Sequence, residues 1–133
     1  MSSEIEQLNS LDNFLNSEDL QLSLRIKRDL FLYLQRCYGS GLFSRNYGAM
    51  ISKLENESNY EILDYLIKTE IVQAVGRYNL TVSPELQAVV GSDMVAVKYE
   101  ENLIQILVIF VPMIKPSVDY LSNFIISVPI YGG

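Results

Sequence analysis

The apolar residues of this sequence change their spacing near Tyr78, and no other feature constrains the fold as much. Before Tyr78 they recur every three or four residues, which is the spacing of helices that bury one face. After Tyr78 they stand in short runs rich in valine, isoleucine and aromatic residues, which is typical of strands. Helices followed by strands indicate an α+β fold. We therefore predict two main N-terminal helices packed on a small antiparallel sheet from the C-terminal half.

The first predicted helix begins after Ser17, a candidate N-cap residue, and runs to about Cys37 without a glycine or a proline. Its apolar side chains form one broad stripe, which predicts a wide buried face. Gly39 follows, and we expect it to end the helix by adopting a left-handed conformation. The second predicted helix begins at residues 58–61, Ser-Asn-Tyr-Glu, which match a capping box, and it runs to about Arg77.

Three strand-like runs follow the second helix, with turn residues between them, and they predict an antiparallel meander. The runs are residues 85–91, 93–101 and 102–112, and the turns are residues 91–93 and 100–102. The third run is apolar on both faces from Leu103 to Val111, so we expect a central or doubly covered strand. A last strand is predicted from Phe124 to Ile130. Its Pro129 indicates an edge strand, because proline cannot donate to the ladder.

The length of 133 residues suits one domain. We expect residues 1–16, which are polar and acidic, to form a flexible N-terminal arm, and residues 17–133 to form a single domain. The single cysteine excludes an internal disulfide framework and fits a reducing compartment. The N-terminus lacks the features of a secretory signal, and the longest apolar run is about half of the ~20 residues that span a membrane. These features predict a cytoplasmic protein without membrane insertion.

The net charge of −6 argues against binding to nucleic acid or to anionic membranes, because both need a cationic face. The one basic cluster is Leu-Arg-Ile-Lys-Arg at residues 24–28. We interpret it as the solvated back of the first helix, or as a contact for an acidic partner surface. The nine tyrosines and five phenylalanines are not interleaved with a basic stripe, so we interpret them as core residues.

The sequence contains no histidine, which excludes imidazole catalysis and zinc sites with imidazole ligands. Cys37 lies on the apolar stripe of the first helix, and we interpret it as a buried structural thiol. We therefore predict no catalytic residue, no metal site and no cofactor. One alternative stays open, a glycosidase that uses paired acids, although capping already accounts for acids at a helix start. The candidate acids are Glu55, Glu57, Glu61, Asp64, Glu100 and Glu101.

The stretch Tyr-Gly-Ser-Gly-Leu-Phe-Ser-Arg-Asn-Tyr-Gly, residues 38–48, has two possible interpretations. Its first glycines resemble the start of a phosphate-binding loop, but no Lys-Ser/Thr pair follows, and the stretch comes after a helix instead of a strand. We interpret it as a structural corner between the two helices. Gly39, Gly41 and Gly48 would give the backbone freedom to turn, and Phe43 and Tyr47 would clamp the corner onto the sheet.

Several motifs occur in order along the chain: LRIKRDLFLYLQ in the first helix, RCYGS at its end, LFSRNYG in the corner and IVQAVGRYN in the second helix. Together with the strands they span residues 22–111. In this order and spacing they resemble the baseplate wedge and sheath-initiator family of contractile injection machines. That family includes a wedge component of contractile phage tails and its counterpart in the type VI secretion baseplate. The KRDL turn of the first helix is closer to the type VI branch.

The resemblance implies a non-enzymatic structural protein that docks to the baseplate wedge and initiates assembly of the contractile sheath. The implied partners are other baseplate wedge subunits and the contractile sheath protein, with the inner tube as a further candidate. We expect the wedge contact at the end of the second helix, and the sheath contact on the strands, where a neighbouring strand can extend an open edge. The wedge-contact residues are Gly76, Arg77, Tyr78, Asn79, Leu80 and Thr81. The sheath-contact residues are Leu103, Ile104, Ile106, Val108, Phe110, Phe124, Ile126 and Val128.

The chain departs from the family at one place. Family members carry Glu-Pro-Arg directly after the aromatic residue that ends the second helix, and this element is implied in docking to the wedge. Here Tyr78 is followed by Asn79, Leu80 and Thr81, so an ionic contact of that kind is not carried over. Three alternatives remain: a wedge protein of a phage tail in a virion, an acidic lysozyme-type glycosidase, which is a label that some members of the family have carried, and a free-standing adaptor unrelated to injection machines.

Overall fold

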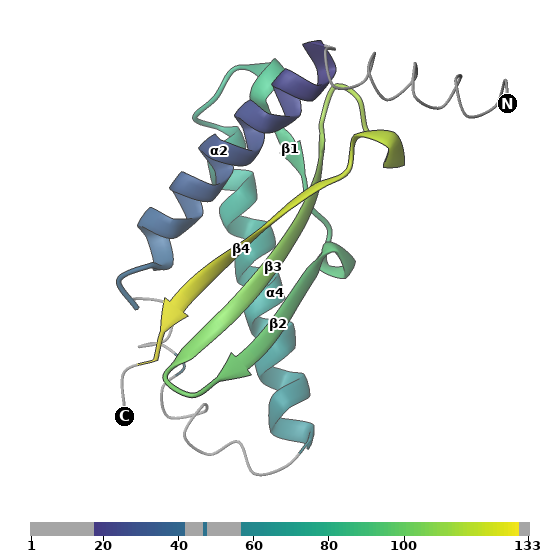
Figure 1. Ribbon diagram of the computed structural model, residues 1–133. Helices are drawn as coiled ribbons and strands as arrows, with labels where there is room; N and C mark the ends of the chain where they lie inside the picture. The colour runs from purple at the N-terminus through teal and green to yellow at the C-terminus, as the bar shows by residue number, and fades with distance from the viewer. Residues whose placement is uncertain (1–17, 42–46, 48–56, 131–133) are drawn as a thin grey trace, which may run out of the picture.

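The computed structural model describes residues 18–41, 47 and 57–130. Two long helices lie against one antiparallel sheet, and the chain has the predicted α+β architecture (Figure 1). The helices are α2 (Glu18–Tyr38) and α4 (Glu57–Asn79), and the short 3-10 helices are η1 (Pro84–Leu86), η2 (Ser92–Met94) and η3 (Val118–Tyr120). The strands are β1 (Ala88–Val89), β2 (Val95–Glu100), β3 (Leu103–Pro112) and β4 (Ser122–Pro129). The predicted arm at residues 1–16 lies outside the described residues.

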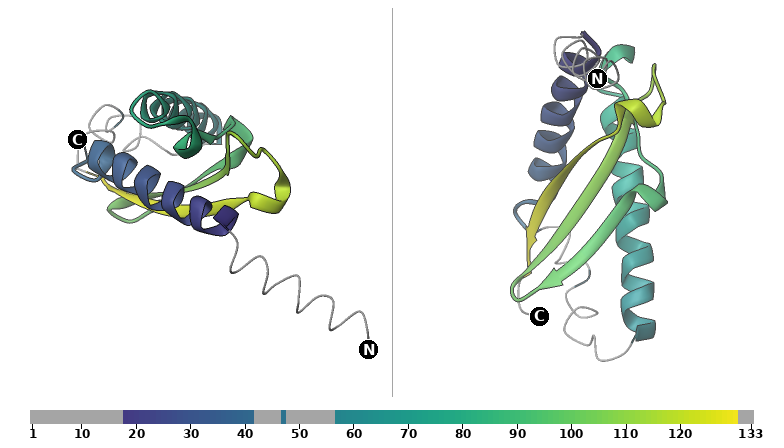
Figure 2. Two further views of the ribbon diagram at one scale, coloured as in Figure 1. Left: turned by 90° about the horizontal axis from the view of Figure 1, so that it is seen from above. Right: turned by 45° about the vertical axis from the view of Figure 1, so that its right-hand side comes forward.

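Strand β3 is the centre of the sheet, as its apolar sequence predicted. One side of β3 pairs with β2 and then with the short β1, and the other side pairs with β4, all antiparallel. Helix α2 runs along the β4 side of the sheet and packs mainly on β4, whereas α4 runs behind β2 and β3 (Figure 2). The helices therefore cover one face, and no described element covers the other.

The core lies between this helix layer and the sheet. Alternate side chains of β3 point into it, and Ile104, Ile106, Val108 and Phe110 have no exposed surface. The stripe of α2 supplies Ile26, Leu30 and Leu34, and that of α4 supplies Leu63, Ile67 and Ile71; all six are also completely buried. Full burial of one such side chain stabilises the fold by about 1.5–3 kcal/mol, so these two stripes and β3 dominate the stability.

The element boundaries correct several predictions. Helix α4 begins at Glu57, so Ser58 lies inside the helix and is not its N-cap. The left-handed residue after α2 is Gly41, with φ 83°, and not Gly39. Gly39 continues the helical pattern, because its N–H still donates to the Gln35 carbonyl at 2.7 Å. The predicted strand at residues 85–91 is reduced to the two residues of β1, because Pro84 opens a 3-10 turn directly before it.

The tight turn between β2 and β3 has the predicted position. Glu100 pairs with Leu103, so only Glu101 and Asn102 form the loop. Asn102 has φ 71°, a conformation that asparagine tolerates better than most residues. This turn sets the register of β2 and β3, and it places the Val95 side chain in the core while the side chains of Ala96 and Lys98 point outward.

Candidate functional site: the edges of the sheet

The resemblance predicts that an edge of the sheet binds another molecule. The direction of the backbone hydrogen-bonding groups decides which strands have an open edge. Strand β3 is paired on both sides and has no open edge except at its ends. The strands with an outer side are β4 on one side of the sheet, and β1 and β2 on the other. Successive residues of a strand direct their N–H and C=O groups to opposite sides in antiparallel pairing, so one known bond assigns all the others.

In β4 the backbone N–H and C=O groups of the odd-numbered residues point away from β3. The Ile130 N–H donates to the Asn102 carbonyl at 2.9 Å, which directs residues 124, 126 and 128 toward β3 and residues 123, 125 and 127 away from it. The side chain of Gln35, on α2, donates from Nε2 to the Ser127 carbonyl at 3.4 Å, which agrees with this assignment. Pro129 has no N–H to offer. Within the described residues, no hydrogen bond reaches the outward groups of Asn123 and Ile125.

The outer side of β1 is closed by a side chain. Asn79 Oδ1 accepts a hydrogen bond from the Ala88 N–H at 2.9 Å, and Asn79 Nδ2 donates to the Ala88 carbonyl at 2.8 Å. The Gln87 side chain donates in turn to the Asn79 carbonyl at 3.0 Å. The amide of Asn79 thus replaces a neighbouring strand for one residue pair, and it fastens the end of α4 to the sheet.

The outer side of β2 is partly open. The backbone groups of residues 104, 106 and 108 of β3 point to β4, so those of the odd-numbered residues of β3 point to β2. They bond with the backbone of Ala96, Lys98 and Glu100. The backbone N–H and C=O groups of Val95, Val97 and Tyr99 therefore point away from β3. The Val95 N–H donates to the Ser92 carbonyl at the end of η2. No hydrogen bond between described residues reaches the outward backbone groups of Val97 and Tyr99.

An apolar hollow lies beside β4. It has a volume of about 360 Å³ and lies between α2 and the start of β4, lined by Leu24, Lys27, Arg28, Phe31 and Phe124. Phe31 packs edge-to-face on Phe124 with ring centroids 5.8 Å apart. Leu24 is 53% exposed on the rim. A strand added to β4 would pass over this hollow.

A polar groove lies beside β2. It has a volume of about 380 Å³ between α4 and η2, and its walls are Glu61, Asp64, Tyr65, Lys68, Thr69, Ser92 and Asp93. The Tyr99 hydroxyl donates a hydrogen bond to Asp64 Oδ1. Burial, and then this hydrogen bond to a carboxylate, raise the pKa of Tyr99. Asp64 therefore ties α4 to β2.

The structure places most of the predicted sheath-contact residues in the core. Ile104, Ile106, Val108, Phe110, Phe124, Ile126 and Val128 are all buried in the core. Leu103 is half-buried at the start of β3, on the outward face. The apolar pattern of these strands therefore marks residues of the core, and the side chains of the seven buried residues are not available to a partner. A strand that adds to the sheet would contact the backbone of β4 or β2, together with outward side chains such as Ile125.

The proposed wedge contact lies at the end of α4, where only part of it is accessible. Tyr78 is buried, and its hydroxyl donates to the Leu86 carbonyl at 2.9 Å. The Asn79 side chain is hydrogen-bonded to the backbone of Ala88, and Thr81 Oγ1 donates to the Tyr78 carbonyl at 2.7 Å. Leu80 is 88% exposed, and Gly76 and Arg77 also lie on the surface.

The corner is only partly described, since Phe43 and Gly48 lie outside the described residues. We predicted that Tyr47 contacts the sheet, but it contacts helix α4 instead: its hydroxyl donates to Glu70 Oε2 at 2.8 Å. Burial, and then the hydrogen bond to Glu70, raise the pKa of Tyr47 to about 12. The Arg77 guanidinium donates to the Tyr38 hydroxyl at 3.4 Å, so the end of α2 is also held to α4.

The carboxylates of the glycosidase alternative are dispersed. Glu55 lies outside the described residues, and Glu100 forms an ion pair with Lys98 at 3.0 Å. Glu61 and Asp64 share one wall of the polar groove, with Asp93 on the other wall. Among the described residues, no group of three or more acids or cysteines has the arrangement of a metal site.

Comparisons of the chain with models of protein families, with curated proteins and with solved structures found no match. No helix in the described part of the chain is long and apolar enough to cross a membrane. Two features of the site had no signal in the sequence: the caps formed by Asn79 and Gln35, and the pair of grooves beside the outer strands.

Proposed function

We propose that this protein is a non-enzymatic structural component of the cytoplasmic baseplate of a type VI-like contractile injection machine. In this role it docks to the wedge and initiates the sheath. The observation that carries the proposal is the open stretch of β4 at Asn123 and Ile125. Its backbone donors and acceptors face outward between a capped carbonyl at Ser127 and the start of the strand. A strand from the first sheath subunits would continue the sheet there.

The described fold supports this role in two further ways. Side-chain caps and prolines close the neighbouring parts of the edge, which limits uncontrolled pairing and leaves a short acceptor. The predicted wedge contact lies at the C-terminal end of α4. There the exposed side chain of Leu80 takes the place of an ionic element. Docking of this protein to the wedge would therefore be apolar in character.

A proline at residue 125 tests the strand-addition step. Ile125→Pro removes an N–H that faces away from β3, so the ladder between β3 and β4 keeps its own hydrogen bonds. Ile125→Thr is the matched control, because it keeps the N–H and a β-branched side chain while it removes the exposed apolar surface. Circular dichroism and thermal unfolding first establish that both variants fold.

Electron microscopy of assembled particles then counts sheaths. We expect few or no sheaths with Ile125→Pro and normal numbers with Ile125→Thr. Sheaths of normal number and length in cells that lack the protein would refute the initiator role. A phage-tail role would instead require the protein in purified virions, where mass spectrometry of the tail would detect it.

The polar groove provides the one specific observation in favour of an enzyme. Glu61→Gln with Asp64→Asn would abolish a glycosidase that uses this groove, whereas assembly of the sheath would continue. Loss of cell-wall hydrolysis by this double variant, with assembly intact, would support the enzyme and contradict the structural role.

A further inference from the structure

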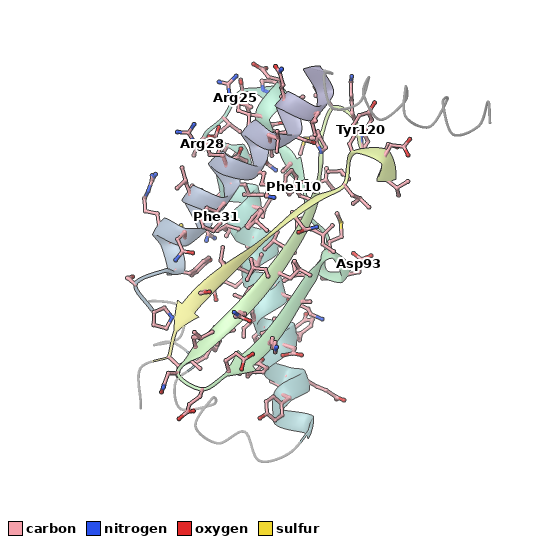
Figure 3. All side chains as sticks on the ribbon, viewed as in Figure 1. Arg25, Arg28, Phe31, Asp93, Phe110 and Tyr120 are labelled. Carbon is pink, nitrogen blue, oxygen red and sulfur yellow. The ribbon has the colours of Figure 1, made fainter. Side chains whose placement is uncertain are left out.

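The two outer sides of the sheet carry opposite charge. On the β4 side, α2 presents Lys27 and Arg28 on the wall of the apolar hollow, whereas the chain as a whole has a net charge of −6. On the β2 side, the polar groove presents Glu61, Asp64 and Asp93 with the single cation Lys68. Figure 3 shows Arg28 on the opposite side of the molecule from Asp93. We name the first surface the cationic border, formed by Lys27, Arg28 and the outward backbone of Asn123–Ile125. We name the second surface the acidic border, formed by Glu61, Asp64, Asp93 and the outward backbone of Val97–Tyr99.

The two borders come level along β3 at Val95, and the outward backbone of Val97–Tyr99 lies two to four residues beyond it. Val95, next to the acidic groove, pairs with Val108, and Val108 pairs on its other side with Phe124, which lines the apolar hollow. A second copy displaced sideways in the plane of the sheet, with a shift of about three residues along the strands, would therefore bring its acidic border against the cationic border. Its α4 would lie beside the first copy's α2, since both helices are on the same face.

The strand directions allow this contact. Strands β2 and β4 are both antiparallel to β3, so they are parallel to each other. A sideways translation would join β4 of one copy to β2 of the next as a parallel pair, a pattern that is common in sheets. A two-fold dimer would instead join β4 to β4 or β2 to β2. Each of these pairings would place like charges against one another, which opposes association.

We propose that copies of this chain associate head to tail, with the acidic border of one copy on the cationic border of the next. The occupant of the apolar hollow and of the open stretch of β4 is then a second copy of the chain, chosen by its complementary charge. A heterologous contact of this kind leaves one open border at each end, so it forms rows or rings and not a closed pair. The proposal does not depend on the baseplate role. Within a row the open stretch of β4 is taken by the next copy, and the last copy of the row keeps that stretch open, where a sheath strand would bind.

Sedimentation velocity of the purified full-length chain over a wide range of concentration tests the proposal. We expect species larger than a dimer that grow with concentration at low salt. They should dissociate as salt shortens the Debye length from about 30 Å at 0.01 M to about 8 Å at 0.15 M. A chain that stays monomeric at high concentration and low salt would overturn the proposal and assign the hollow to another protein. A dimer that does not grow would also overturn it, in favour of two-fold pairing.

Charge reversal then identifies the surfaces. Lys27→Glu with Arg28→Glu makes both borders acidic, and Glu61→Lys with Asp93→Lys makes both cationic; all four residues are at least partly exposed, so both variants should fold. We expect each variant alone to associate at least ~10-fold more weakly than the wild type, and an equimolar mixture to regain association. The second variant lowers the net charge from −6 to −2, so non-specific association would increase, not decrease. Unchanged association of either variant alone, or no recovery in the mixture, would refute the contact.

Discussion

Asn79 provides the sharpest test of how the sheet edge is closed. In Asn79→Ala the side-chain amide is lost, and the N–H and C=O of Ala88 lose the partners that hold them at 2.9 and 2.8 Å. Ala88 is only 1% exposed, so water cannot easily replace these partners. The variant also loses the attachment of the end of α4 to β1.

The expected magnitude follows from the two bonds. A buried backbone group left without a partner costs about 1–3 kcal/mol. Relaxation of the exposed Val89 and the surrounding loop would let some water reach these groups, so we take the lower half of that range for each group. We therefore expect Asn79→Ala to lower the free energy of unfolding by about 2–4 kcal/mol, a large share of the ~5–15 kcal/mol typical of a domain.

Urea unfolding followed by circular dichroism measures this change. Leu80→Ala is the matched control, because Leu80 is 88% exposed and its truncation should alter stability by less than ~0.5 kcal/mol. Asn79→Asp is a second comparison: the carboxylate still accepts from the Ala88 N–H but cannot donate to its carbonyl, so its loss should be intermediate. If Asn79→Ala unfolds within ~0.5 kcal/mol of the wild type, the amide does not cap β1 and the reasoning fails.

Three further predictions concern single residues and pH. Ser23→Ala should raise the free energy of unfolding by about 1 kcal/mol in the same urea assay, because Ser23 Oγ is buried without a hydrogen-bond partner among the described residues; a loss of stability would contradict this. Gly41→Ala should destabilise by about 1–2 kcal/mol, because the residue has φ 83°, and a neutral result would show that the turn can change its conformation. Burial raises the pKa of Tyr38 and Tyr78 to about 12 from 10.0, so the unfolded chain ionises first: stability should be unaffected by these groups below pH 10 and fall as pH rises from 10 to 12. Tyr78→Phe should reduce that slope, and an unchanged slope would contradict the assignment.

The elements could be predicted because their signals are local. The helical spacing in α2 and α4 and the two-residue alternation in β2 depend only on which face of each element meets the core. The prediction that β3 is central followed from its two apolar faces, and Pro129 correctly indicated an edge strand. The errors at Ser58 and Gly39 are shifts of one or two residues at helix ends, where several neighbouring residues can serve as the boundary.

The contact residues could not be predicted in the same way. Ile106 and Phe124 were selected for a partner because they are apolar and lie in strands, but core residues and binding residues share these properties. Only the tertiary structure shows that they face the helices and are buried. Tyr47 was expected to contact the sheet, yet its partner Glu70 lies on α4, and nothing in the local sequence distinguishes a helix from a sheet as the surface that it contacts.

By itself, the sequence determined that two helices would cover a sheet with β3 at its centre, because the hydrophobic periodicity of each segment can be read from that segment alone. The tertiary structure alone decided which backbone groups remain open, because that depends on residues distant in the chain. Gln35 reaches the carbonyl of Ser127 across 92 positions, and α2 and α4 bring opposite charges to the two sides of one sheet. Such contacts between residues distant in the sequence depend on how the elements pack, which no local pattern encodes.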